Sequence, residues 1–436
     1  MKRHWILAVA LVLSAGSAFA NNYRLSVWMR SHWDKSNSVA DFNTNNQGVV
    51  HEVNPMWYYF STHTGSQGTV VDIVANYDTS SDVPTLTNGA VLVPTLKNHG
   101  TWPDPYTPNQ YMQWIFRSEA DMNDHADKVA AMVINNGWAG VDLDYEAMLT
   151  GVSSTDVPMW RDNFTSLVRR IKKRLPDKIV SVCVYRRRSL SGSTDSSNSL
   201  IYDYKALTDN GGADYLKIMM YNDLSCCSEL VNDTAMGQGL TFAEQQIADH
   251  KKIIVALPWY AANTATGAEG PSEPNASGLG RSTPSDEQTF TSPYTGVQID
   301  AQALRHKILT VITKHDVGGF AFYATGYELT GVWDVLRGRL GTEGATITAG
   351  TQSGTCPGNG IVASVSLPTG ATSTTYNWFE TQITCCAASY PLPLWVASGT
   401  PASPTLPRAF SSVRVSGIVG SKVFEAEADP IRSGCP

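Results

Sequence analysis

Short apolar runs alternate with stretches of helical periodicity from Tyr23 to about Leu340. The apolar runs are rich in β-branched and aromatic residues and are bounded by turn-forming residues, which is typical of buried strands. The runs that qualify as strands are 25–29, 56–60, 90–96, 140–146, 179–185, 215–221, 253–257 and 319–323. Several of them are separated by a segment with helical spacing, so the pattern predicts repeated β/α units.

The clearest helix is a stripe of apolar residues that ends before Pro176. It consists of Trp160, Phe164, Leu167, Val168, Ile171 and Leu175. Other helices are indicated before Asn136 and around 304–312, and Thr241 with Glu244 has the spacing of a capping box ahead of a further helix. Eight strands with intervening helices predict an α/β fold of the (β/α)8 or TIM barrel type. The functional residues of such a barrel lie at the carboxyl ends of its strands.

The strand at 140–146 carries an unusual row of acids. Asp142, Asp144 and Glu146 alternate with apolar residues, so the three carboxyl groups share one face of the strand. Acids inside a barrel are costly to bury unless they have a function. Two alternatives are an edge strand with solvated acids and a calcium or magnesium site. No calcium-loop spacing follows and no His joins the acids, so we expect neither a metal nor a cofactor.

The composition changes after about Gly341. Thr, Ser, Gly and Pro become frequent, charges become sparse and helical periodicity is lost. Four of the 7 cysteines fall here, so we expect 341–436 to be a small β-rich domain cross-linked by disulfide bonds. Cys183 lies in an apolar run and is the expected free thiol. The cysteines whose pairing the sequence leaves open are Cys226, Cys227, Cys356, Cys385, Cys386 and Cys435.

Residues 1–20 have the features of an export signal. Lys2 and Arg3 precede an apolar run, and Ala18 and Ala20 fit a small-residue cleavage site. We therefore expect a secreted or periplasmic protein cleaved near Ala20, with the barrel over 21–340. The apolar run is too short to span a bilayer, and no later segment is long enough. A formal net charge of -7 gives no reason to expect a nucleic-acid partner, and we expect a monomer.

The acidic strand resembles the signature Asp-Gly-x-Asp-x-Asp-x-Glu of glycoside hydrolase family 18, the chitinase family. Segments 217–222, 253–260 and 318–323 are similar, in the expected order, to the motifs of the sixth, seventh and last strands of that family. Segment 54–59 is similar to the second strand of a branch that includes spore-cortex and peptidoglycan hydrolases. The resemblance covers 23–340. The departures from the family pattern are Ala139 and Asn222 in place of Asp, Lys217 in place of Gln, and Tyr323 in place of Trp.

The resemblance implies substrate-assisted, retaining hydrolysis of β-1,4 bonds in N-acetylglucosamine polymers such as chitin. Glu146 would act first as an acid and then as a base. Asp144 would orient the acetamido group of the substrate and stabilise the oxazolinium intermediate, and Tyr221 would donate a hydrogen bond to the acetamido oxygen. Asp142 would share a proton with Asp144, because like charges this close resist joint ionisation.

The ends of other strands are expected to contact the substrate. Met219 and Asn222 belong to the sixth-strand motif, and Trp57 and Tyr323 are candidate stacking faces for sugar rings that fit the core of the barrel end equally well. The implied partner is a polysaccharide that contains N-acetylglucosamine. The alternatives are a peptidoglycan- or glycan-directed N-acetylglucosaminidase and an inactive sugar-binding barrel. The intact Glu146 favours an enzyme.

Overall fold

A computed structural model describes two compact units of the chain, which meet in sequence between Trp333 and Asp334. In the first unit the described residues are 23–30, 42, 45–46, 49–66, 68–76, 90–100, 105–190, 196–209, 211–224, 229–273, 275–277, 279 and 287–333 except 330. In the second unit they are 334–336 and the strands between 346 and 428 that are named below.

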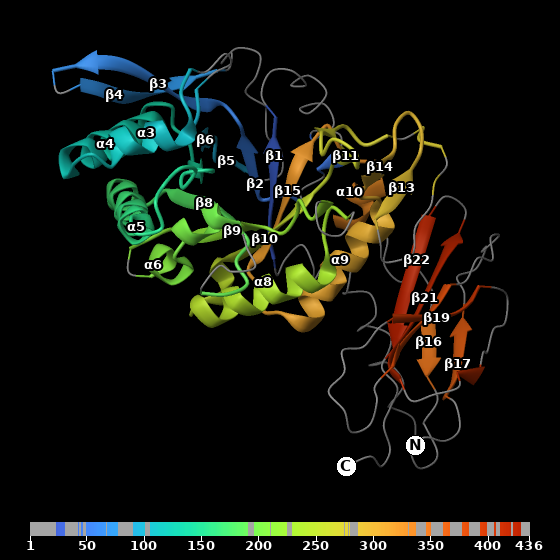
Figure 1. The fold of residues 1–436 in the computed structure, drawn as a ribbon. Helices are drawn as coiled ribbons and strands as arrows, with labels where there is room; N and C mark the ends of the chain where they lie inside the picture. The colour runs from blue at the N-terminus through green and yellow to red at the C-terminus, as the bar shows by residue number, and fades with distance from the viewer. Residues whose placement is uncertain are drawn as a thin grey trace, which may run out of the picture. The chain divides into compact units, whose positions relative to one another are not determined.

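One large sheet forms the centre of the first unit (Figure 1). Its neighbours pair in the order β4-β3-β6-β7-β8-β9-β10-β15-β1-β2-β5, parallel throughout except for the antiparallel pair β3–β4. The strands are β1 (Arg24–Met29), β2 (Glu52–Pro55), β3 (Tyr58–Gly65), β4 (Gly68–Ala75), β5 (Val91–Leu92), β6 (Thr95–Lys97), β7 (Gly140–Asp144), β8 (Ile179–Tyr185), β9 (Tyr215–Met219), β10 (Ile253–Pro258) and β15 (Gly319–Thr325). Each of the eight predicted strands overlaps a strand of this sheet, and the prediction at 90–96 corresponds to two short strands, β5 and β6. β2 and β4 were not predicted.

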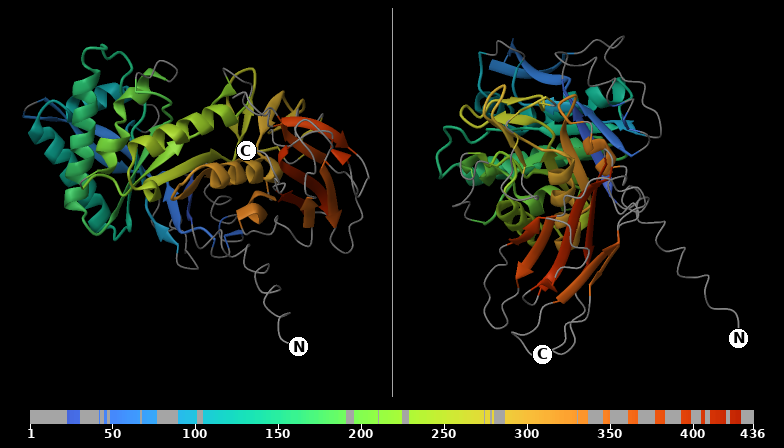
Figure 2. Two further views of the ribbon diagram at one scale, coloured as in Figure 1. Left: turned by 90° about the horizontal axis from the view of Figure 1, so that it is seen from below. Right: turned by 90° about the vertical axis from the view of Figure 1, so that its right-hand side faces the viewer.

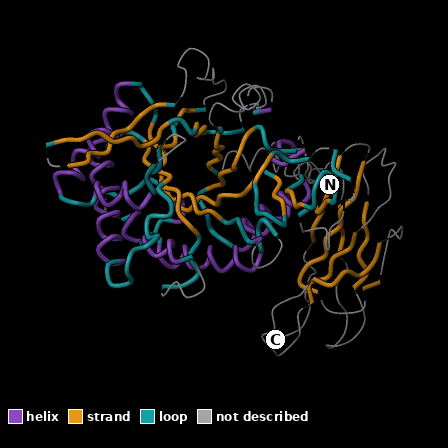
Figure 3. The backbone as a smooth tube through the Cα atoms, turned by 45° about the horizontal axis from the view of Figure 1, so that its top comes forward, coloured by secondary structure: helices purple, strands orange, loops and turns teal. Residues whose placement is uncertain are grey.

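The sheet is strongly curled, which is consistent with a TIM-like barrel (Figure 3). The interrupted strands explain how its two ends approach each other. β5 pairs with β2 and β6 pairs with β7, yet β5 and β6 are separated only by Val93 and Pro94. Proline has no N–H to donate, so a break of the ladder at this point is expected.

Helices flank the outer side of the sheet (Figure 2). The described helices are α3 (Pro108–Ile115), α4 (Glu119–Asn135), α5 (Val157–Arg174), α6 (Tyr204–Thr208), α8 (Asp233–Gln246), α9 (Ala301–Lys314) and α10 (Gly331–Leu336), with 3-10 turns η1 (Ser197–Ile201) and η2 (His250–Lys252). The predictions of α4, α5 and α9 are confirmed. The predicted capping box is wrong: Thr241 lies inside α8, whose N-cap is Asn232, because apolar packing extends the helix through Thr241.

The inner strands pack closely and are almost entirely buried. Every residue of β7 and of β10 is buried, as is typical of parallel strands that are covered on both faces. Gly140 opens β7 where a Cβ atom would come 2.1 Å from the Ile179 carbonyl oxygen, so only glycine fits this approach to β8. This contact positions the acid-bearing strand against its neighbour.

A small antiparallel sheet follows β10 in the chain. It has the order β12-β11-β14-β13 and consists of β11 (Ala261–Asn263), β12 (Glu269–Gly270), β13 (Gln288–Phe290) and β14 (Gly296–Gln298). Within the ranges described above, no helix is long and apolar enough to cross a membrane.

The second unit contains antiparallel strands in two small sheets. They are β16 (Thr346–Ala349), β17 (Ile361–Ser366) and β20 (Thr405–Leu406) in one, and β18 (Asn377–Gln382), β19 (Pro393–Ser398), β21 (Phe410–Val419) and β22 (Lys422–Ala428) in the other. All of these strands lie within the range 341–436, for which a small β-rich domain is predicted. The six cysteines expected to form disulfide bonds, and the expected signal at 1–20, lie outside the described residues. Cys183 is a buried free thiol, as predicted.

Candidate active site

The three predicted acids lie at the carboxyl end of β7 and just beyond it. Asp142 is completely buried, Asp144 is 8% exposed, and Glu146, two residues after the strand, is partly exposed. The side chains of Asp142 and Asp144 point to the same face of the strand, because residues two apart do so. The row of acids thus runs from the closed interior toward the accessible end of the strand.

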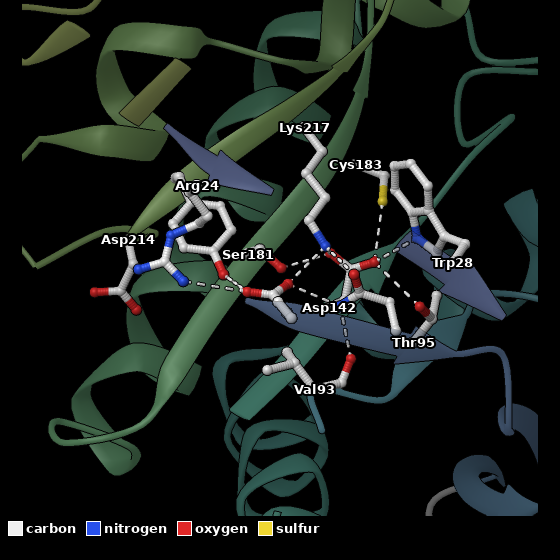
Figure 4. A network of polar contacts seen from close by, with 12 residues as sticks. Arg24, Trp28, Val93, Thr95, Asp142, Ser181, Cys183, Asp214 and Lys217 are labelled. Carbon is white, nitrogen blue, oxygen red and sulfur yellow. Dashed lines mark hydrogen bonds and ion pairs between the residues drawn. The ribbon is translucent and has the colours of Figure 1, made fainter. Parts of the chain in front are cut away.

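Asp142 lies in a dense polar network (Figure 4). Trp28 Nε1 and Thr95 Oγ1 donate hydrogen bonds to its Oδ2 atom over 2.9 and 3.1 Å, and Ser181 Oγ donates to Oδ1. The ammonium of Lys217 lies 3.1 Å from Oδ1. Burial by itself raises the pKa of Asp142, but the Lys217 charge and these hydrogen bonds outweigh burial, so the pKa lies below its ordinary value.

Asp144 is hydrogen-bonded to Glu146 rather than to Asp142. Burial, followed by the charge of Glu146, raises the pKa of Asp144 well above its ordinary value. Lys97 opposes this rise, with its Nζ atom 4.0 Å from Asp144 Oδ2. We expected Asp142 to share a proton with Asp144. In the structure the Asp142 oxygens accept hydrogen bonds from Trp28, Thr95 and Ser181, and Glu146 is the hydrogen-bond partner of Asp144.

The backbone and the carboxylate of Glu146 are fixed by two neighbouring strand ends. Asn98, which follows β6, accepts a hydrogen bond from the Glu146 N–H over 2.9 Å and donates one to its carbonyl oxygen over 2.7 Å. Tyr185, the last residue of β8, donates its hydroxyl hydrogen bond to Glu146 Oε2 over 2.8 Å. These contacts hold the Glu146 carboxyl group at the carboxyl ends of the strands, with its Oε2 atom accepting the hydrogen bond from Tyr185.

The residues of the sixth-strand motif lie beside the acids. Met219 is the last residue of β9 and packs into the buried cluster that Tyr221 borders. Burial, with Tyr260 and Glu146 nearby, raises the pKa of Tyr221 well above its ordinary value, so it is a neutral hydrogen-bond donor. Asn222 has a φ angle of 71° and accepts a hydrogen bond from Tyr260 over 2.7 Å. Asn tolerates this left-handed conformation better than most residues.

The two candidate stacking faces have different surroundings. Trp57 is 3% exposed and packs on Trp138 with ring centroids 5.6 Å apart, so it has no face to offer a sugar and belongs to the core. Tyr323 is partly buried and meets Trp28 and Tyr260 edge to face. It remains a candidate for contact with the substrate.

Three residues that contact Asp144 or Glu146 were missed by the sequence analysis: Lys97, Asn98 and Tyr185. Tyr185 ends a predicted strand, so the rule that barrel chemistry lies at strand ends could have found it. Lys97 and Asn98 fall just after the predicted 90–96 strand, and its observed end is Lys97 itself. Among the described residues there is no group of three or more His, Cys, Asp and Glu side chains that could hold a metal ion.

The family model described as "Glycosyl hydrolases family 18" matches residues 101–328, a little over half of the chain. No curated protein matches the chain. Among solved structures, the chain is similar to a class V chitinase from Pseudomonas fluorescens, with 16% identity and a TM-score of 0.57 over 73% of this chain and 99% of that chain.

Two further solved structures are similar to the chain. The spore cortex-lytic enzyme SleL from Bacillus cereus has 13% identity and a TM-score of 0.56, over 73% of this chain and 74% of that chain. A chitinase from Chromobacterium violaceum has 16% identity and a TM-score of 0.56, over 73% and 99%. At these identities the likeness establishes a shared fold.

Proposed function

Because the chain belongs to glycosyl hydrolases family 18 and is therefore a glycosidase, we propose that it hydrolyses β-1,4 bonds in N-acetylglucosamine polymers by substrate-assisted, retaining catalysis. The observation that carries the proposal is the hydrogen-bonded pair Asp144–Glu146 at the carboxyl end of β7, with Glu146 partly exposed. Two carboxyl groups in contact hold one proton between them, because like charges this close resist joint ionisation.

In the proposed reaction Glu146 gives its proton to the glycosidic oxygen as the bond from that oxygen to the anomeric carbon breaks. The oxygen of the substrate's own acetamido group forms the new bond to the anomeric carbon. The ionised Asp144 stabilises the positive oxazolinium that results, and Tyr221 donates a hydrogen bond to the acetamido group. Water then attacks the anomeric carbon and gives a proton to Glu146, which restores the acetamido group and the β configuration.

The spacing of the acids supports a nucleophile supplied by the substrate. Retaining enzymes with a carboxylate nucleophile keep their two carboxyl groups about 5–5.5 Å apart, and inverting enzymes keep them about 6.5–9.5 Å apart. Glu146 acts on Asp144 both as a neighbouring charge and as a hydrogen-bond partner, which favours a pair that shares a proton over a pair that has room for a sugar carbon or a water between its carboxyl groups. Asp142 is completely buried behind them and cannot reach a sugar.

We also propose finer features of the protein that agree with this function. The strand pairs β2–β5 and β6–β7 favour a closed (β/α)8 barrel. The sequence features of 1–20 favour export, with cleavage near Ala20. Expression of the full chain in a bacterium tests export: the mass of the protein from the periplasm or medium should correspond to a chain that begins near Asn21.

An incubation experiment identifies which polymer is the substrate. The mature protein is incubated with N-acetylated chitooligosaccharides and with purified peptidoglycan, and the products are identified by mass spectrometry. Chitin fragments are expected; release of peptidoglycan fragments alone would make the protein a peptidoglycan N-acetylglucosaminidase, a reading favoured by its likeness to a spore cortex-lytic enzyme. Binding without products from either polymer would contradict hydrolysis and favour a sugar-binding barrel.

The mechanism has its own test. Losing a hydrogen bond or two to an acetamido group costs about 1–3 kcal/mol. Losing an intramolecular nucleophile forfeits an effective molarity worth about 7–11 kcal/mol. Fully deacetylated oligomers should therefore be essentially inert. Proton NMR of a fresh reaction on acetylated oligomers should show the β-anomer first, and an initial α-anomer would refute substrate assistance.

A further inference from the structure

Three ionisable side chains meet in the closed interior of the sheet, and Figure 4 labels two of them, Asp142 and Lys217. Glu52 comes from β2, Asp142 from β7 and Lys217 from β9, and none of the three has any exposed surface. Lys217 bridges the two acids, with its Nζ atom 2.9 Å from Glu52 Oε1 and 3.1 Å from Asp142 Oδ1. A buried charge persists only when it is paired and hydrogen-bonded.

The ammonium of Lys217 is fully occupied. Its third contact is Asn54 Oδ1 at 2.7 Å, so its three N–H donors have three oxygen acceptors. The ring of Trp28 lies 5.0 Å from Nζ and contributes a cation–π contact. Tyr215 donates its hydroxyl hydrogen bond to Glu52, on the side away from Lys217. The three oxygen acceptors and the Trp28 ring therefore favour a positive charge on the side chain of residue 217.

The surroundings of Asp142 are those of a carboxylate. The donors around its two oxygens are Ser181 Oγ, Lys217 Nζ, Trp28 Nε1, Thr95 Oγ1 and the Cys183 thiol. The ammonium and the indole can only donate, and they engage one oxygen each. A protonated Asp142 could direct its hydrogen only toward Ser181, Thr95 or Cys183, whose own hydrogen would have to turn away, and it would lose its charge–charge attraction to Lys217. These contacts therefore favour the ionised form of Asp142.

We propose that Lys217 is a positioning residue that keeps Asp142 a permanent anion, so that the catalytic proton is shared by Asp144 and Glu146 alone. The inference rests on the proposed function, since it assigns the reactive proton to that pair. It follows that Asp142 acts on the reaction through its fixed charge. Its negative charge keeps a proton on the pair above it, and it takes no part in proton transfer.

The direct test follows the ionisation of Asp142 in the full-length protein. Carbon-13 NMR of protein labelled at the Asp carboxyl carbons, with Asp142→Asn for assignment, is recorded as a function of pH. In the unaltered protein the Asp142 resonance should remain that of a carboxylate down to a pH below the ordinary Asp pKa of about 3.9. A resonance that titrates together with that of Asp144 would overturn the proposal.

Variants show whether Lys217 is the cause. In Lys217→Met, which removes the charge but keeps an unbranched side chain, the Asp142 resonance should titrate above the ordinary Asp range. Removing one partner of a buried pair is costly, so the charge-balanced double variant Glu52→Gln/Lys217→Met provides a second test that leaves fewer unpaired charges. Glu52→Gln alone is the matched control and should leave Asp142 ionised, because Lys217 remains. An Asp142 that stays ionised without Lys217 would overturn the proposal.

A rate measurement connects the network with turnover. Loss of the Lys217 cation should move the pH window of kcat/KM on an N-acetylglucosamine oligomer upward by at least about half a pH unit, whereas Glu52→Gln should not move it upward. Equal loss of activity in both variants with no change of the window would mean that Lys217 is only structural. The NMR titration needs no substrate. If the protein hydrolysed neither polymer, the proposed function would be refuted, and the titration would still test the role of Lys217.

Discussion

Lys97 offers the sharpest electrostatic test of the candidate site. Its ammonium lies 4.0 Å from Asp144 Oδ2, and the two side chains are 23% and 10% exposed. The change to make is Lys97→Met, which removes the charge and leaves a side chain of similar length. A cation beside a carboxyl group favours its ionised form, so Asp144 without Lys97 should hold its proton more tightly.

The size of the effect follows from the distance between the two groups. Two unit charges 4 Å apart interact by about 4 kcal/mol at an effective dielectric constant of about 20 and by about 1 kcal/mol in water. Because Lys97 is partly open to solvent, we take about 1–2 kcal/mol, or about one pH unit. The active form of the pair carries one proton, so the pH window of activity should move up by about that amount.

The assay is kcat/KM on a soluble N-acetylated oligomer between about pH 3 and 10, at low and at high salt. Lys97→Arg is the matched control, because it keeps the positive charge and should leave the window near its original place. A Lys97→Met window that stays in place or moves down would refute the reasoning. So would an equal upward shift in Lys97→Arg, because the effect would then come from packing rather than from charge.

Other changes give independent predictions. Glu146→Gln should lower kcat by at least about 10²–10⁴-fold while sugar binding measured by calorimetry persists, because the acid is lost and the shape is kept; a near-normal rate would exclude Glu146 as the acid. Tyr185→Phe removes a hydrogen bond to Glu146 and should lower kcat about tenfold, with KM little changed. Burial lowers the pKa of His125 from 6.5 to about 3, so the unfolded chain binds the proton first as the pH falls. Stability measured by urea should drop by about 2–3 kcal/mol between pH 7 and 4.5, and His125→Gln should abolish most of this drop.

The fold was predictable where local pattern decides structure. The eight strands are short, apolar and bounded by turn residues, and most of their residues are buried, with β7 and β10 buried completely. The capping-box prediction at Thr241 failed because that pattern considers only neighbours in sequence, whereas α8 is fixed by an N-cap at Asn232 and by burial of its apolar face. Trp57 was ambiguous for a similar reason: an aromatic residue near a strand end looks the same whether it faces a sugar or Trp138.

The site was predictable only in part, because its partners are brought together by the curl of the sheet. Three acids in alternation could be read along one strand. The bridge from Glu52 to Lys217 joins residues 165 positions apart, and nothing near Lys217 in the sequence identifies Glu52 as its counter-ion. From the sequence, Lys217 was recognised only as a residue that replaces the Gln of a family motif. In the structure it explains how Asp142 remains charged in a closed interior.

The charges of the interior also account for the protonation of the reactive pair. Six charged groups lie between the start of the strands and their ends. The positive groups are Arg24, Lys217 and Lys97, and the negative groups are Glu52, Asp142 and the Asp144–Glu146 pair. With one proton on the pair, three positive charges balance three negative charges. A second proton or the loss of the first would leave a net charge in a poorly solvated region, which is costly. The singly protonated pair that hydrolysis requires is thus the state that this arrangement of charges favours.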